Sequence, residues 1–457
     1  MRRSTALALA RPRRATVERR RFALIALSIS GAAALLLAAI HVLRLPAIDE
    51  AGLARYVTES GLRPGVVIGT LLLAVPVLSL VVQALRIGSV ARDRRMASLR
   101  LAGATPGDVR VIAALEAGSA ALAGGLLAGP AYLVLWVLAG VIPPAGARMV
   151  ATPDALDALA WVIVVPVAAV AGALAGAAIH GRVVVEPLGV RRRSRTAPPG
   201  RASLWLLIAG LVLVIAGVAG LTRVAHGAGG LALIVLAMLG LLLAAFAGGS
   251  RFVLACARVL AKRRGAEALM ASRRLRADPR SPGRVAAVLL VCGVALGVEM
   301  LVLATQLRDG GFNDDVAFYL GGLGLAAFVA LVAALVAVLT LLVGAADALL
   351  DARRPLATLA AVGVDEQALA RTLSRQLSAT AVPAIAAGAL FGAPVFVLLG
   401  VAFVGGSAVG ATVFAFLAGA CGAIVGGLAM IAASRLAARL LRPQIRAAVD
   451  PENLRVA

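Results

Sequence analysis

The chain has 457 residues, of which 61% are hydrophobic and only 15% are charged, and its mean hydropathy is +0.98. A soluble domain does not contain that much apolar surface, so the composition predicts a protein that crosses a membrane several times. The net charge of +23 comes from arginines in short loops between apolar runs. The positive-inside rule explains this pattern, and no nucleic-acid partner is expected.

A helix needs about 20 mostly apolar residues to cross a bilayer. Loops rich in arginine alternate along the chain with short loops that are poor in it. We therefore expect a protein of the bacterial cell (inner or plasma) membrane, with both termini in the cytoplasm. The predicted fold is an all-α polytopic membrane protein with about ten transmembrane helices, a count that is open by one pair near Arg223. The ten apolar runs are 22–45, 65–86, 110–141, 158–181, 204–222, 228–248, 285–306, 318–346, 377–403 and 408–432.

Two segments between spans resemble each other. VARDRRMASLRLAG (90–103) and ARRPLATLAAVG (352–363) both end in glycine, and Gly103 aligns with Gly363 at an offset of 260 residues. At the same offset Leu99 aligns with Leu359, and Glu116 aligns with Gln376. Self-similarity at a fixed offset indicates an internal duplication.

The duplication predicts two repeats of four spans each, covering residues 22–181 and 285–432. Residues 182–284 form a linker that contains two further spans and basic cytoplasmic loops. Residues 1–21 form a basic cytoplasmic N-terminus, and residues 433–457 form a cytoplasmic C-terminal tail.

Each loop segment predicts a short helix with a narrow apolar stripe, formed by Met96 and Leu99 in the first helix. We expect each stripe to lie on the membrane face or in a groove of a partner protein. Anchoring of the arginines by lipid phosphates is the alternative. The stripe of the second helix consists of Leu349, Ala352, Leu356 and Leu359, and the arginines of the first are Arg92, Arg94, Arg95 and Arg100.

The segment RRMASLRLAGATPGDVRVIAALEAGSAALAGGLLAG (94–129) resembles the signature of FtsX/MacB-like permease domains, the membrane subunits of a class of ABC transporters. The family's usual glutamate is replaced by Arg95, and in the second copy Pro355 and Gln376 depart from the pattern. The large extracytoplasmic domain of the family is missing, because loops 46–64 and 307–317 are short. The matching residues are Arg94, Leu99, Arg100, Gly103, Ala104 and Glu116 in the first copy and Arg354, Leu359 and Gly363 in the second.

The resemblance implies a permease subunit whose loop helices contact a separate ATPase subunit, expected as a homodimer. It also implies export or extraction of a hydrophobic substrate: a lipid, a lipoprotein, or a membrane-active peptide or antibiotic. Whether a second permease chain is identical or different stays open. The implied coupling residues are Arg94, Arg95, Leu99, Arg100 and Gly103 in the first helix, and Arg354, Leu356, Leu359 and Gly363 in the second.

The chain has no P-loop of its own. A P-loop needs Gly-Lys-Ser/Thr, and the single lysine, Lys262, lies in AKRRG. ATP and Mg²⁺ are therefore expected on the partner, with no cofactor and no catalytic residue in this chain. His41, His180 and His226 lack ligand spacing, so no metal site is expected.

Glu299 is the most deeply placed acid of the apolar runs. A charge near the middle of a bilayer is costly, so this side chain should face protein or water, either as a substrate or proton contact or as a packing residue. Glu116 lies nearer the cytoplasmic edge and is expected to orient the first loop helix through Arg110. Glu299, Glu116 and Gln376 are the candidate intramembrane polar residues.

Two other functions compete with a permease subunit. Members of the family also act as non-transporting membrane proteins that regulate a cell-envelope enzyme or a kinase. A secondary transporter can likewise be built from repeats, but it would be expected to carry several ionisable residues at mid-membrane, and this chain offers chiefly Glu299. Substrate flux in reconstituted vesicles separates these functions.

Overall fold

The apolar runs form helices because lipid offers no hydrogen-bond partners, so each backbone N–H and C=O must be paired within its own segment. The computed structural model describes residues 16–45, 53–59, 63–86, 98–99, 101–141, 148, 150–180, 200–221, 228–308, 316–404 and 408–450. In these residues every regular element is a helix, apart from one bridge between Leu53 and Arg148. The prediction of an all-α fold is confirmed for this part of the chain.

Nine of the helices in the described ranges are long and apolar enough to cross a membrane. They coincide with nine of the ten predicted spans, so the chain is a multi-pass membrane protein. The remaining predicted span, 65–86, corresponds to α4 (Arg63–Arg86), a helix of 24 residues. Its membrane crossing stays a prediction.

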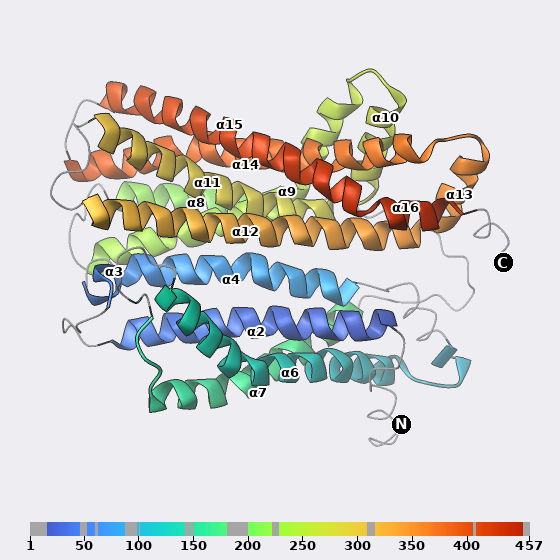
Figure 1. Ribbon diagram of the computed structural model, residues 1–457, viewed down its shortest axis with the longest axis horizontal. Coiled ribbons are helices and arrows are strands. Elements are labelled where there is room, and N and C mark those ends of the chain that lie inside the picture. Colours follow the sequence, from blue (N-terminus) through green and yellow to red (C-terminus); the bar gives the residue numbers. More distant parts are fainter. Residues whose placement is uncertain are drawn as a thin grey trace. The chain divides into compact units, whose positions relative to one another are not determined.

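The first of two compact units covers residues 1–192. α2 (Thr16–Arg44) is its central helix and packs against α4, α6 (Pro106–Val141) and α7 (Ala155–His180). α6 also packs along α7, and the single turn α3 (Arg55–Thr58) lies against α4 (Figure 1). The unit therefore contains all four spans of the predicted first repeat.

The second unit covers residues 193–457, with α11 as its central helix. α11 packs against α9, α12, α14 and α15, and α14 packs along α15. The two helices of the predicted linker, α8 and α9, pack against each other and against α14. The helices of this unit are α8 (Arg201–Leu221), α9 (Ala228–Ala261), α10 (Ala266–Ala277), α11 (Arg280–Arg308), α12 (Val316–Asp351), α13 (Arg353–Ala361), α14 (Glu366–Val404), α15 (Ala408–Leu440) and α16 (Arg442–Val449).

Glycines let the central helices approach their neighbours closely. Gly293 and Gly297 of α11 face the backbone of α14, and a Cβ on Gly388 of α14 would overlap the carbonyl oxygen of Leu290. Gly124 of α6 faces α2 in the same way in the first unit. Lipid tails are as apolar as leucine, so helices in a membrane associate through such close packing.

Gly388→Leu should lower the stability of the chain by about 1–3 kcal/mol, because the new side chain has no room between α14 and α11. Gly324→Leu on α12 is the matched control, since a Cβ added to this glycine would meet no atom within 4 Å. Thermal unfolding in detergent, followed by tryptophan fluorescence, measures both. Equal midpoints for the two variants would contradict the role of the glycine contact.

Candidate functional site

The two aligned glycines each follow helical residues and share one backbone conformation. Gly103 has φ of 92° and Gly363 has φ of 96°, in the left-handed region that favours glycine. The N–H of the residue after each glycine donates back across the turn: Ala104 to the carbonyl of Leu99 at 3.0 Å, and Val364 to that of Leu359 at 3.1 Å. This six-to-one bond is the Schellman motif of helix ends.

A long helix starts directly after each glycine turn. Thr105 caps α6: its hydroxyl accepts a hydrogen bond from the Asp108 N–H at 3.2 Å, and its own N–H donates to Asp108 Oδ2 at 3.0 Å. This reciprocal pair forms a capping box. The carbonyl of Thr105 accepts from the Val109 N–H, and that of Asp365 accepts from the Leu369 N–H, both at 3.2 Å. The two turns thus share a backbone geometry at the offset of 260 residues.

The apolar stripe of the second loop helix is covered by the chain itself. Leu356 is only 1% exposed and Leu359 is half-buried. They pack into one cluster with Leu349, Leu369 and Leu373, and Ala352 lies against the same cluster. The prediction that this stripe is free to dock in a partner or on the membrane is therefore wrong. In the first loop helix, Leu99 is half-buried against Val109 and Ile112.

The cover of the second stripe is α16, which sequence analysis placed in the cytoplasmic tail. Leu441, Ile445 and Ala448 are buried in the same cluster as Leu356. Arg446 Nε lies 3.0 Å from both carboxylate oxygens of Glu366, at the start of α14. The signal for this helix was present in the sequence, because the spacing of Leu441, Ile445 and Ala448 by four and three is that of one helix face.

The tips of both turns expose apolar side chains. Leu101 is 91% exposed and Val362 is 80% exposed, and both lie outside the candidate spans. Neither residue was singled out from the sequence, where they look like ordinary members of an apolar run. Arg94, Arg95 and Arg100 lie outside the described residues, and so does the side chain of Arg354.

Glu116 forms an ion pair within the first unit. Its Oε2 lies 3.5 Å from Nη1 of Arg21 in α2, and both side chains are nearly buried. This pair ties α6 to α2, which the sequence did not predict because the residues belong to different spans. Its aligned counterpart Gln376 is half-buried on α14 of the second unit, and its carbonyl accepts a hydrogen bond from Thr380.

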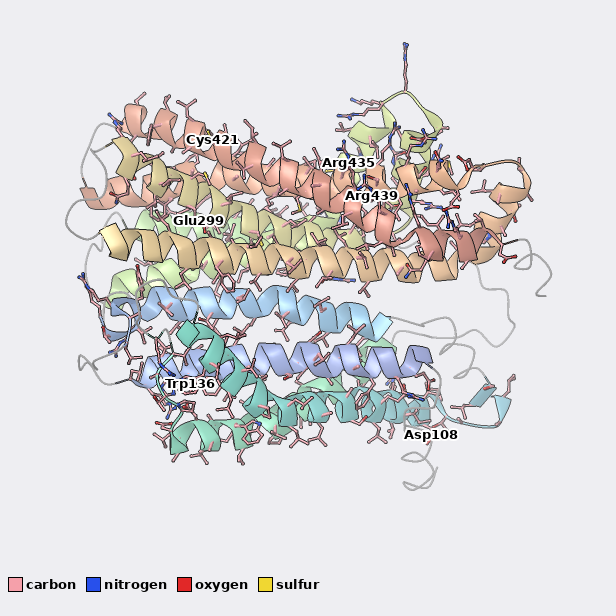
Figure 2. All side chains as sticks on the ribbon, in the orientation of Figure 1. Asp108, Trp136, Glu299, Cys421, Arg435 and Arg439 are labelled. Carbon is pink, nitrogen blue, oxygen red and sulfur yellow. The ribbon has the colours of Figure 1, made fainter. Side chains whose placement is uncertain are left out.

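Glu299 lies on α11 nine residues before Arg308, or about 13 Å from the end of the helix. Its Oε1 atom is buried, and none of the described residues donates a hydrogen bond to it. Figure 2 shows this side chain within the second unit, well away from α10, α13 and α16. A carboxyl group without a partner inside a span is a functional candidate by default.

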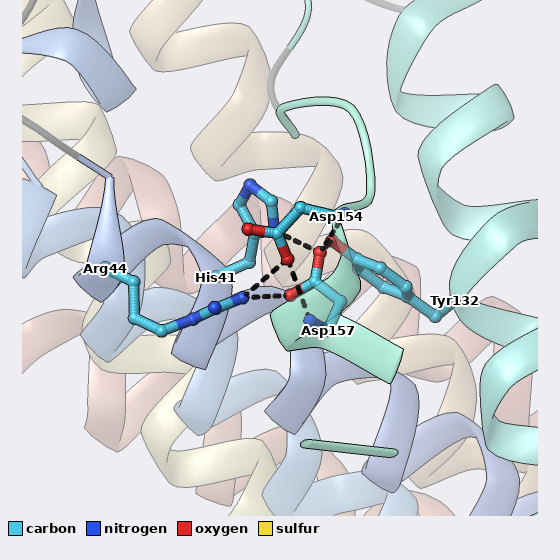
Figure 3. A network of polar contacts seen from close by, with 5 residues as sticks. All are labelled: His41, Arg44, Tyr132, Asp154 and Asp157. Atoms are coloured by element: carbon cyan, nitrogen blue, oxygen red, sulfur yellow. Dashed lines mark hydrogen bonds and ion pairs between the residues drawn. The ribbon is translucent and has the colours of Figure 1, made fainter. Parts of the chain in front are cut away.

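A cluster of polar side chains joins three helices of the first unit (Figure 3). His41 Nδ1 bonds Asp157 Oδ2, and Arg44 Nη2 bonds Asp157 Oδ1. Arg44 also reaches Asp154 Oδ1 at 3.3 Å, and the Tyr132 hydroxyl lies 3.5 Å from Asp157 Oδ2. His41, Tyr132 and Asp157 are buried, so the cluster fixes the end of α2 to the start of α7.

The two acids of this cluster also cap α7. The Asp157 N–H donates to Asp154 Oδ1 at 2.8 Å, and the Asp154 N–H donates to Asp157 Oδ2 at 3.1 Å. Burial favours a higher pKa for Asp154, but the bond from the Asp157 N–H and the guanidinium of Arg44 hold its pKa below the ordinary value. Its contribution to stability is therefore present above the unfolded pKa of about 3.9 and is lost as pH falls through the lower folded value.

The same cluster contains potential metal ligands. His41 Nδ1 and one oxygen each of Asp154 and Asp157 lie within 4.8 Å of one another. The sequence did not indicate this group, because the histidine is 116 residues away from Asp157. The guanidinium of Arg44 lies against both carboxylates and offsets one of their two negative charges.

No family model and no curated protein matches the sequence. What the chain does must therefore follow from its own residues. Three features of the described residues bear on function: the two glycine turns with their exposed tips, the polar cluster at Asp157, and the lone acid Glu299.

We expect Asp157→Asn to lower stability by about 3 kcal/mol, because it removes the buried partner of His41 and Arg44. Thermal unfolding in detergent measures the change. Asp108→Asn is the control, since this acid caps α6 at a solvent-accessible position and its loss should lower stability much less than the loss of Asp157. When Asp157→Asn is combined with Arg44→Gln, the loss of stability should be smaller than the sum of the two single losses, because both residues act in one network. Additive losses would show that the cluster is not a unit.

Glu299→Leu should raise stability by about 1–3 kcal/mol, because it replaces a buried carboxyl oxygen without a partner by an apolar side chain. Glu59→Leu, at an exposed acid outside the spans, should change stability by less than about 0.5 kcal/mol. Thermal unfolding in detergent compares the two. A clear loss of stability in Glu299→Leu would show that this acid is held by a partner in the folded chain.

Proposed function

We propose that the chain is the transmembrane permease subunit of an FtsX/MacB-like ABC transporter, and that a separate ATPase subunit hydrolyses the ATP. The observation that carries this proposal is the matched pair of glycine turns at Gly103 and Gly363. Each turn follows helical residues, exposes a large apolar side chain and is followed after two residues by a helix that is long and apolar enough to span the membrane. Two such turns suit contact with a dimeric partner.

The packing of the two units supports an internal duplication. In the first unit α2 packs against α4, α6 and α7, and in the second α11 packs in the same way against α12, α14 and α15. The pair α6 and α7 likewise corresponds to the pair α14 and α15. Buried positions also correspond at the offset of 260 residues, with Val109 matching Leu369 and Ile112 matching Thr372. In this proposal α8 and α9 are the linker between the repeats.

Hydrogen bonds and packing connect each turn firmly to the span that follows it, so a movement of the turn would also move the span. At Gly103, the Schellman bond ends the helical residues around Leu99, and the capping box of Thr105 starts α6. Hydrogen bonds therefore fix the backbone on both sides of the turn. At Gly363, α16 also holds α13 and α14 together through the buried cluster at Leu356. Closure of the ATPase dimer would push on Leu101 and Val362, and α6 and α14 would carry the movement across the membrane.

The distribution of arginine favours an ATPase on the cytoplasmic side of the membrane and a substrate that is reached from within the membrane or from its opposite side. Because arginine-rich loops lie in the cytoplasm, the turns at Gly103 and Gly363 would face the ATP pool of a bacterial cell. The opposite loops, 46–64 and 307–317, are too short for a domain that grips a soluble ligand. Export or extraction of a hydrophobic substrate from the membrane is therefore favoured, with Glu299 as the polar contact within the spans.

The proposal predicts that exposed apolar tips hold the ATPase. Leu101→Asp combined with Val362→Asp should weaken ATPase binding at least about tenfold, because both side chains would lose apolar contacts and bring a charge into the interface. The full chain is purified from its own cells in mild detergent. The measurement is the amount of ATPase that co-purifies and its activity with and without the permease.

Leu307→Asp is the matched control, because this residue is also a strongly exposed leucine but lies in the last turn of α11, beside the loop opposite the proposed partner. It should leave ATPase binding unchanged. Full transport by the chain alone in vesicles, or undiminished ATPase capture by the double variant, would overturn the proposal. ATPase capture without substrate flux in vesicles would identify a regulator of a cell-envelope enzyme instead of a transporter.

A further inference from the structure

The short helix α10 has one face packed in the second unit and one face open. Ala268, Ala271, Ser272 and Leu275 are buried, and the helix packs against α9 and α14. The open face carries Leu269, which is 49% exposed, together with Arg273 and Arg276. These three residues follow at intervals of four and three, so they lie on one side of the helix.

An ion-pair clamp holds α10 in place. Glu267 lies 3.2 Å from Arg371 Nε and 3.2 Å from Arg375 Nη2, both on α14. The side chain of Glu267 is only 19% exposed, so its charge is directed at α14 rather than at the solvent. Because two arginines meet one glutamate, the clamp itself leaves a surplus of one positive charge.

The open face is cationic along its whole length. The only other acid between residues 262 and 280 is Asp278, which is half-buried and accepts hydrogen bonds from the N–H groups of Arg280 and Ser281 at the start of α11. No exposed acid therefore interrupts the positive charge in this fully described segment. We call this surface the α10 cationic face; it consists of the exposed residues Lys262, Arg263, Arg264, Leu269, Arg273, Arg276 and Arg280.

We infer that the α10 cationic face binds the phosphate headgroups of anionic phospholipids. α9 ends at Ala261 and α11 begins at Arg280, and both are candidate spans, so the face lies where a headgroup layer borders the bundle. Six cations between the ends of two spans match the charge density that attracts anionic lipid. The exposed Leu269 amid them suits the boundary between headgroups and acyl chains, where an apolar side chain gains from insertion.

Lipid binding at this face would act on the second glycine turn. The Glu267 clamp joins α10 to Arg371 and Arg375, within the first ten residues of α14, and α14 starts directly after Gly363. A headgroup that fixes α10 would therefore also fix the start of α14. This inference is independent of the proposed ATPase coupling, because it rests only on α10 and its neighbours.

The experiment uses the full chain in nanodiscs made of phosphatidylcholine alone or with added phosphatidylglycerol. The wild-type chain should unfold at a higher temperature with phosphatidylglycerol and should retain this lipid in native mass spectra. Arg273→Gln combined with Arg276→Gln should weaken phosphatidylglycerol binding about tenfold or more while leaving the midpoint in phosphatidylcholine unchanged. Added inorganic phosphate should not reproduce the stabilisation.

The matched control is Arg435→Gln combined with Arg439→Gln, two exposed arginines one helical turn apart on α15 (Figure 2). This variant should keep the wild-type response. An unchanged lipid response in the α10 variant, an equal loss in the control, or stabilisation by free phosphate would each overturn the inference. Loss of the ATPase with an intact lipid response would assign the face to the ATPase instead. Absence of any ATPase partner would leave the lipid result standing.

Discussion

In lipid, two helices gain most when their backbones come close, because the surrounding acyl chains are as apolar as the side chains. The second unit depends on such contact between Gly293 of α11 and Gly388 of α14, and the first on Gly124 of α6 against α2. These contacts fix the helices that follow the two glycine turns. A span that is packed along its whole length moves as a rigid helix when the turn before it is displaced. A loosely packed span would bend instead.

The local features of the chain could be predicted from the sequence, because each is encoded in one continuous stretch. Hydropathy locates the spans since a helix in lipid satisfies its own backbone, and nine of the ten predicted runs correspond to candidate spans. The glycines at 103 and 363 end their helices for an equally local reason, namely their positive φ. Whether the chain couples to an ATPase stays a prediction.

The contacts between distant segments could not be predicted in this way. Asp154 and Asp157 have the spacing of a helix cap, but nothing nearby in the sequence indicates that they also meet His41 and Arg44 of another span. The pairing of Arg21 with Glu116 is hidden for the same reason. The sequence alone predicts that the stripe at Leu356 lies on the membrane face or in a partner's groove, because its actual cover, α16, is distant in the chain.

The position of α16 in the chain has a consequence for biogenesis. Every candidate span precedes Arg442, so the membrane-embedded part of the second unit can insert before α16 has been synthesised. Until then Leu356 has only its contacts within α12, α13 and α14, and the turn at Gly363 lacks the part of its packing that α16 supplies. The turn at Gly363 would therefore reach its final packing only after the last candidate span has been made and α16 has folded back onto α13 and α14.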